Sequence, residues 1–230
     1  MILRNYLPEH HLAAESRDVV KMGAGFIGTM AALLLGLLVA SAKQSFDTDR
    51  SELSQLAAKI TFLDRVLVHY GPETGPARES VRRSVERIIE QMWPQDAGTP
   101  VQLDPTTTGG EAVYEVLDSL SPKTDEQRTL KGVALSNAAD ISQLRWLLLA
   151  QKGTSISTPM LVVVIFWLSI IFLSFGLFTS PNATVLTTLF LCALSVSAAV
   201  FLVLELDQPF GGVIQISSAP LQDALAHLGK

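Results

Sequence analysis

The sequence is poor in the residues from which disulfides and metal sites are built. It contains one cysteine, Cys192, and four histidines among 230 residues. A single cysteine excludes a disulfide within the chain, and Cys192 lies in an apolar segment, where a small buried hydrophobic residue is the simpler interpretation. His10 and His11 are adjacent but have no third ligand nearby, so we interpret them as surface residues. We expect no metal and no cofactor.

Catalytic motifs are also missing. The sequence has no P-loop, no H-E-x-x-H, no C-x-x-C and no G-x-S-x-G. A nucleic-acid surface requires a basic patch, yet residues 43–158 carry 13 Lys/Arg against 16 Asp/Glu, and the whole chain has a net charge of −5. We therefore expect neither an enzyme nor a nucleic-acid-binding protein.

Charge is absent from long stretches of the chain. No Asp, Glu, Lys or Arg occurs from Met160 to Leu204, and the turn-like segment 179–182 divides this run into halves of about 20 residues. A third apolar block covers 22–42. Each block is long enough for an α-helix to cross a hydrocarbon core, where charges are costly. We predict an integral membrane protein with spans at 23–42, 160–178 and 183–204, and the lipid bilayer is its first expected partner.

The first apolar block has one feature of a signal peptide. Ala40-Ser41-Ala42 resembles a cleavage site, but the apolar run is too long for a typical signal core. We interpret the block as an uncleaved anchor that follows a polar juxtamembrane segment, 1–22.

The first span carries a small residue at every fourth position. Spacing of four keeps these residues on one helix face, where missing side-chain bulk lets another helix approach closely in lipid. Two interpretations stay open: a seam between subunits, or packing against the other spans of the same chain. The residues are Ala24, Gly28, Ala32, Gly36 and Ala40.

Between the first two spans, 43–158 has the pattern of an extramembrane helical bundle. A heptad seam from Phe46 to Tyr70, broken only by Asp49, predicts that one helix continues from Met22 to Gly71-Pro72. We expect shorter helices at 76–93 and 111–120, with a loop at 95–110 between them. The arginines of the first of these favour a solvated face over an anion-binding patch.

A last bundle helix is predicted to start at a capping box, Thr124 to Gln127, and to reach Gly153. Asn137 occupies its seam, where an apolar residue is expected. Asn137 either fixes register or a partner helix, or it is a packed polar residue with a local partner. The two long helices connect directly to spans, so an antiparallel bundle standing on the membrane is the simplest arrangement.

The chain ends in segment 205–230, which has a short motif and a helix expected to dock through Leu221, Ala224, Leu225 and Leu228. Glu205 and Asp207 are the carboxylates attached to a span, at a helix C-terminus where the dipole disfavours negative charge. In a symmetric oligomer they would form rings of the kind that select cations. Otherwise they face interfacial water or cap neighbouring backbone.

The terminal segment Glu205-Leu206-Asp207-Gln208-Pro209-Phe210-Gly211-Gly212, followed by Ile214–Leu221, resembles the signature of the bestrophin-like family of bacterial and plant membrane proteins. The segment from Leu35 to Ala40 is similar to the first span of that family. The resemblance implies an integral membrane protein distantly related to bestrophins, which are oligomeric anion channels gated by calcium. The sequence departs from bestrophins because it has three clear spans rather than four.

The sequence therefore predicts an all-α, three-span homo-oligomer of the bacterial inner (plasma) membrane. The leading hypothesis is an ion channel or channel-like conduit, with ions as partners. The alternative is a non-conducting scaffold or sensor whose bundle binds protein partners. Positive residues near the membrane favour a cytoplasmic bundle.

Overall fold

The computed structural model describes residues 14–93, 110–150, 157–178 and 182–228. Most of the predicted juxtamembrane segment, nearly all of the 95–110 loop and residues 179–181 of the 179–182 turn lie outside these residues. All the regular elements in the described part of the chain are helices, which confirms the predicted all-α class. The chain divides into two compact units, Met1–Ser45 with Thr154–Asp207 and Phe46–Gly153 with Gln208–Lys230.

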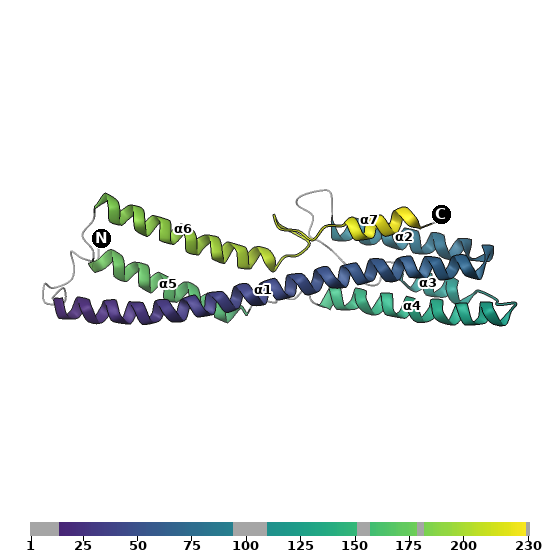
Figure 1. Cartoon of the computed structure of the whole chain (residues 1–230), viewed down its shortest axis with the longest axis horizontal. Helices are drawn as coiled ribbons and strands as arrows, with labels where there is room; N and C mark the ends of the chain where they lie inside the picture. The colour runs from purple at the N-terminus through teal and green to yellow at the C-terminus, as the bar shows by residue number, and fades with distance from the viewer. Residues whose placement is uncertain (1–13, 94–109, 151–156, 179–181, 229–230) are drawn as a thin grey trace. The chain divides into compact units, whose positions relative to one another are not determined.

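Three helices have the length and hydropathy needed to cross a membrane. They are α1 (Ala14–Tyr70), α5 (Thr158–Phe178) and α6 (Ala183–Leu206). The first unit contains α5, α6 and the apolar part of α1 (Figure 1). Asn182 starts α6 as its N-cap, because the Asn182 Oδ1 accepts a hydrogen bond of 2.8 Å from the Val185 N–H.

Helix α1 is longer than predicted at its start. It begins at Ala14 rather than Met22, because residues 14–21 contain neither proline nor glycine and continue the helix. It ends at Tyr70, as the Gly71-Pro72 sequence predicts. Gly71 has φ 136°, a left-handed conformation that favours glycine and terminates the helix.

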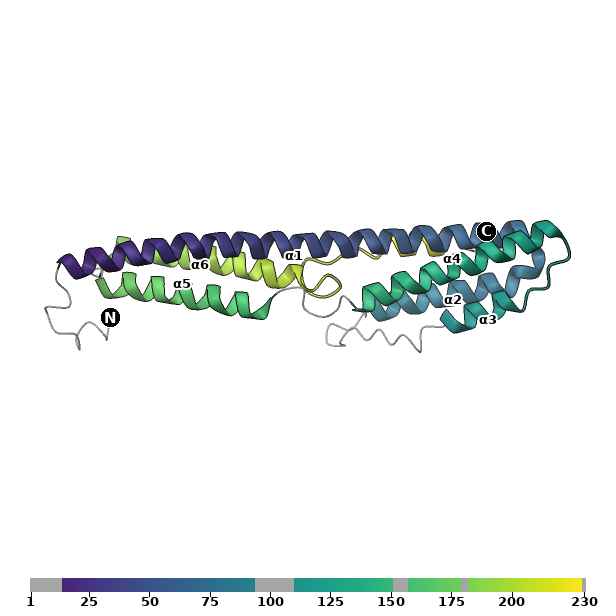
Figure 2. The same ribbon diagram turned by 90° about the horizontal axis from the view of Figure 1, so that it is seen from below.

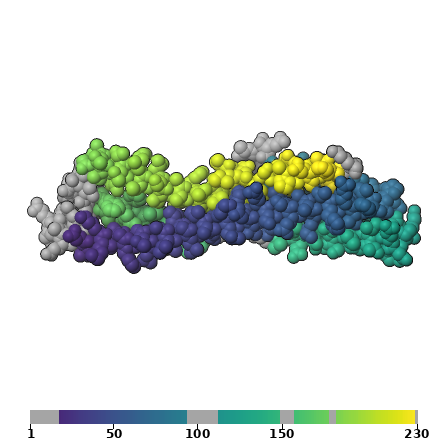
Figure 3. Space-filling model, viewed as in Figure 1, coloured from purple at the N-terminus to yellow at the C-terminus, as the bar shows by residue number. Residues whose placement is uncertain are grey.

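The second unit is a helical bundle built on the C-terminal part of α1. It adds η3 (Pro72–Thr74), α2 (Gly75–Met92), α3 (Gly110–Asp118), α4 (Asp125–Ala150) and α7 (Ala219–His227). Helices α2 and α4 lie beside this part of α1, and α3 packs against α2 and α4 on the side away from α1 (Figure 2). Helix α7, on the face seen in Figure 3, packs against α2. The heptad seam forms the core, in which the following side chains are fully buried: Leu53, Leu56, Ile60, Leu63 and Leu67.

Helices α1 and α4 are antiparallel and keep one register along their contact. Gln127 Nε2 donates to the Tyr70 carbonyl at 3.0 Å, and Asn137 Nδ2 donates to the Lys59 carbonyl at 2.8 Å. Moving ten residues forward on α4 therefore moves eleven residues back on α1. The cap of α4 also forms: the Gln127 N–H donates to Thr124 Oγ1 at 3.1 Å, while Gln127 Oε1 accepts from the Lys123 N–H.

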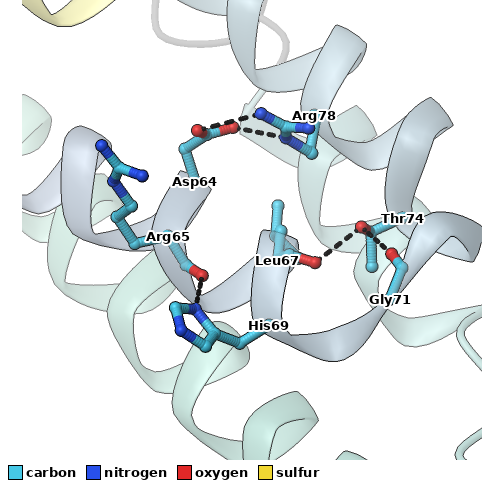
Figure 4. A network of polar contacts seen from close by, with 7 residues as sticks. All are labelled: Asp64, Arg65, Leu67, His69, Gly71, Thr74 and Arg78. Carbon is cyan, nitrogen blue, oxygen red and sulfur yellow. Dashed lines mark hydrogen bonds and ion pairs between the residues drawn. The ribbon is translucent and has the colours of Figure 1, made fainter. Parts of the chain in front are cut away.

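Polar contacts fix the corner between α1 and α2 (Figure 4). The Thr74 hydroxyl lies 2.7 Å from both the Leu67 and the Gly71 carbonyl oxygens. Arg78 donates from Nε and Nη2 to the two carboxylate oxygens of Asp64, at 2.7 and 3.2 Å. The Asp64 side chain is only 6% exposed, so the paired guanidinium satisfies a carboxylate that would otherwise be buried without a partner.

Candidate functional site

The predicted ion-pathway residues lie at the end of α6. Glu205 is in the last turn of the helix and Asp207 is its C-cap. Both are half-buried, and both make interactions within the chain. Their role in ion passage stays a prediction, and their position at the C-terminus of a membrane helix is the feature that supports it.

Five hydroxyl groups in the two apolar helices are hydrogen-bonded within their own helices. Ser169 and Ser174 donate to carbonyls four residues back, at 2.7 and 2.8 Å. Thr187, Thr188 and Ser195 in α6 do the same at 2.9 Å. Such bonds allow a hydroxyl to face either lipid or water, so these residues do not by themselves define an aqueous lining.

The small-residue face of α1 is only partly used within one copy of the chain. Ala24 is buried, whereas Ala32, Gly36 and Ala40 are exposed. A Cβ added at Gly28 would lie 3.8 Å from Ile171 of α5, and one added at Gly36 would meet no described atom within 4 Å. The first part of the face therefore packs inside the chain, while the second remains available to another helix.

Asp49, the break in the heptad seam, is a buried carboxylate near the start of the bundle. Asp49 is 8% exposed. Burial and, to a smaller extent, the negative charge of nearby Glu52 together raise the pKa of Asp49 from 3.8 to about 6. No group of three His, Cys, Asp or Glu among the described residues is arranged to hold a metal ion.

Arginines occur in two different settings on the bundle. Arg82 and Arg83 of α2 are exposed and pair with Glu86 and Glu79, at 3.2 and 3.6 Å. Arg145 instead lines a cavity of about 30 Å³ among α1, α2, α3 and α4. Burial lowers the pKa of Arg145, and the like charge of Arg87 lowers it further. The cavity has room for about one water molecule, so it cannot hold an organic ligand.

Asn137 lies buried between α4 and α1, with the Lys59 carbonyl as its local partner. Whether Asn137 also contributes to a subunit interface stays a prediction. Beside it, Lys59 Nζ pairs with Asp140 Oδ2 at 2.7 Å. These residues, with Phe62 and Val133, line an open groove of about 440 Å³. Phe62 is 52% exposed, so its ring contributes apolar surface to this groove.

The terminal motif docks on the end of α2. Trp93 Nε1 donates to the Ile216 carbonyl at 2.9 Å, and the rings of Trp93 and Phe210 meet edge to face with centroids 5.6 Å apart. Phe210 and Ile216 are buried, and so are Leu221 and Ala224 of the docked helix α7 and its C-cap residue Leu228. The residues that carry the family resemblance therefore hold the C-terminal segment on the bundle.

The sequence did not predict two of these features, the pairing of Asp64 with Arg78 and the contact of Trp93 with Ile216. Asp64 follows the buried Leu63 directly, and a carboxylate at the border of an apolar seam is a signal that a cation lies nearby, but the sequence does not identify Arg78 as that cation. For Trp93, the sequence indicated only that it ends the helix predicted at 76–93. Its partner Ile216 is 123 residues away, and no local pattern links them.

Two solved structures have a similar fold. Both are variants of a bacterial bestrophin homologue from Klebsiella pneumoniae, one with a leucine and one with an isoleucine replaced by threonine. Their TM-scores are 0.69 and 0.65 at 14% and 16% identity, and each match covers 90% of this chain and 85% of the other. At this identity the likeness shows the fold alone.

No curated protein matches this sequence. A protein-family match, in contrast, covers nearly the whole sequence. A family model described as Bestrophin-like domain matches residues 1–221, which include all three apolar helices and the terminal motif. The chain therefore belongs to the bestrophin-like family.

Proposed function

We propose that copies of this chain assemble in the bacterial inner membrane into an ion channel. The observation that carries the proposal is the low burial of the apolar helices. Only 17%, 6% and 11% of their most hydrophobic windows are buried within one copy. Three helices packed so sparsely do not enclose a water-filled path, whereas a ring of copies can do so. Membership of the bestrophin-like family supports the same function.

The proposed pathway passes the end of α6, where Glu205 and Asp207 would form rings. A ring of carboxylates attracts cations and repels anions near the membrane surface. Two unit charges interact by about 1–4 kcal/mol at close range in surface-like surroundings, which is enough to bias permeation. The half-buried position of both residues supports this role, because it reduces screening by bulk water.

Recording from purified protein in lipid bilayers tests the proposal. The wild type should conduct, and Glu205→Gln with Asp207→Asn should shift the reversal potential under a salt gradient toward less cation preference. Asp223→Asn provides the matched control, because Asp223 is an exposed carboxylate on α7 outside the proposed pathway. An unshifted reversal potential in the double variant would exclude the selectivity role while leaving conduction in place.

The rival function is a non-conducting scaffold, and the groove between α1 and α4 is the observation that favours it. The groove measures about 440 Å³ and includes the exposed Phe62 and Val133. A partner helix could cover these side chains. Electron micrographs would show whether the purified protein forms a homo-oligomer. If the oligomer forms but never conducts over a wide range of pH, voltage and divalent-cation concentration, the scaffold function would replace the channel proposal.

A further inference from the structure

The chain between α6 and α7 forms a closed loop with an apolar tip. The Gly211 N–H donates to the Gln208 carbonyl at 3.1 Å, and the Ile216 N–H donates to the Pro209 carbonyl at 2.8 Å. These bonds bring the two ends of the loop together. Val213, at the tip, is 82% exposed, and its neighbour Ile214 is 36% exposed.

The exposure of this tip is held by the fold. Phe210 on one side of the loop and Ile216 on the other are both buried, and Trp93 contacts both of them. Gly212 has φ 92°, a conformation that a glycine adopts without strain. Gln215 Nε2 donates a hydrogen bond of 2.7 Å to the Gly212 carbonyl. Two branched apolar side chains are therefore presented outward from an anchored turn.

The position of the loop in the chain indicates what covers the tip. Val213 follows Leu206, the last residue of α6, by seven positions, so the chain limits its distance from the helix end to about 25 Å. The Gln208–Gly211 turn shortens that reach. Residues 208–222 also contain no Asp, Glu, Lys or Arg, unlike the charged outer face of α2. An uncharged loop with an apolar tip, joined to a span by a few residues, is suited to the lipid headgroup layer.

We propose that Val213 and Ile214 insert into the lipid interface on the side of the membrane where α6 ends, and that they anchor the docked C-terminal segment to the bilayer surface. Because Phe210 and Ile216 attach the same loop to Trp93, the anchor links lipid contact to the end of α2. The inference goes beyond the proposed function, because it requires only that α6 spans the bilayer and not that the protein conducts.

Site-directed fluorescence tests the anchor in the full-length protein. The single native cysteine allows a Cys192→Ala background, to which Val213→Cys is added and labelled with an environment-sensitive nitrobenzoxadiazole dye. Ala226→Cys, exposed on α7, provides the water-facing control, and Leu194→Cys, 57% exposed in the middle of α6, provides the lipid control. The proteins are reconstituted in phosphatidylcholine–phosphatidylglycerol vesicles that carry nitroxides either on headgroups or deep on acyl chains.

We expect blue-shifted emission at position 213 and headgroup-nitroxide quenching several-fold above that at position 226. Position 194 should respond more strongly to the acyl-chain nitroxide. Quenching at 213 equal to that at 226 would place the tip in water and overturn the proposal. Blue-shifted emission at 213 without quenching by either lipid would overturn it as well, because a second copy or another protein would then cover the tip.

Discussion

At the scale of single residues, the pair of Asp64 and Arg78 should contribute strongly to stability. Arg78→Ala leaves the Asp64 carboxylate buried without a partner, and we expect a loss of about 3 kcal/mol in the free energy of unfolding. Thermal unfolding of the detergent-solubilised protein, followed by circular dichroism, measures the loss as a lower Tm. Arg83→Ala is the matched control, because its pair with Glu79 is exposed and contributes less than about 1 kcal/mol.

Replacing both partners of the same pair shows whether the stability lost in Arg78→Ala comes from the missing ion pair or from the buried, unpaired Asp64 carboxylate. Asp64→Leu combined with Arg78→Leu should recover part of the stability that Arg78→Ala loses, because no buried charge remains unpaired. Equal Tm values for Arg78→Ala and Arg83→Ala would show that burial of Asp64 carries no penalty.

Asp49 predicts a pH dependence of stability with a definite sign. Its folded-state pKa of about 6 lies above the ordinary value of 3.8, so the folded protein binds more protons than the unfolded chain between these values. Stability should fall as pH rises through this window and then level off. Asp49→Asn should remove the dependence and stabilise the protein at pH 7 by about 1–3 kcal/mol. Thermal unfolding at pH 4.5 and 7 measures both effects.

The surface carboxylate Glu90 provides the control for that measurement. Glu90 is exposed on α2, so Glu90→Gln should leave the pH dependence of the wild type in place. A variant Asp49→Asn that keeps the wild-type dependence would assign it to other groups.

Residue identities were predictable from the sequence where a periodic pattern set an expectation. Asn137 and Asp49 were noticed because each interrupts an apolar seam, and both lie buried in it. Their environments were not predictable, since the Lys59 carbonyl reaches Asn137 only through the antiparallel register of α1 and α4. Pairing across the bundle depends on tertiary packing, which local spacing does not encode.

At the scale of helices, the sequence located most elements because proline, glycine and capping residues mark their ends. Pro76 suits the first turn of α2, and Gly71 lies where α1 stops. The start of α1 was placed too late, because the change from polar to apolar residues at Met22 marks a change of solvent rather than a helix boundary. Hydropathy and helix limits are different signals.

The small-residue face of α1 yields a test of assembly. Gly36→Leu changes an exposed position that contacts no described atom within the copy, so it should weaken only close approach between helices of different copies. We expect a smaller species by native mass spectrometry. Gly23→Leu, also without a described neighbour within 4 Å, is the matched control. Gly28→Leu is less informative, because it also meets Ile171 within the chain.

An unchanged oligomer in Gly36→Leu would show that this part of the face contacts lipid rather than another copy. If both glycine variants reduced the oligomer equally, added bulk anywhere on the outside of α1 would explain the result. Only a loss confined to Gly36→Leu supports a specific seam.

At the scale of the whole molecule, three helices that all cross the membrane would place residues 43–158 and the C-terminus on one side and the turn before α6 on the other. The side expected to be cytoplasmic has five basic residues near the membrane, Lys43, Arg50, Lys59, Arg145 and Lys152. The other side has three, Arg4, Arg17 and Lys21, and the turn before α6 has none, so the positive-inside rule favours a cytoplasmic bundle. In the Cys192→Ala background, Gly98→Cys should therefore resist a membrane-impermeant maleimide in intact cells and react after lysis.

The opposite side of the membrane supplies the control for this orientation. Ala183→Cys, exposed in the first turn of α6, should react in intact cells. Reversed labelling of the two positions would place the bundle outside the cytoplasm, and the rings proposed at Glu205 and Asp207 would then face the outer solution. Labelling of both positions in intact cells would show that α5, the apolar helix between them, does not cross the bilayer.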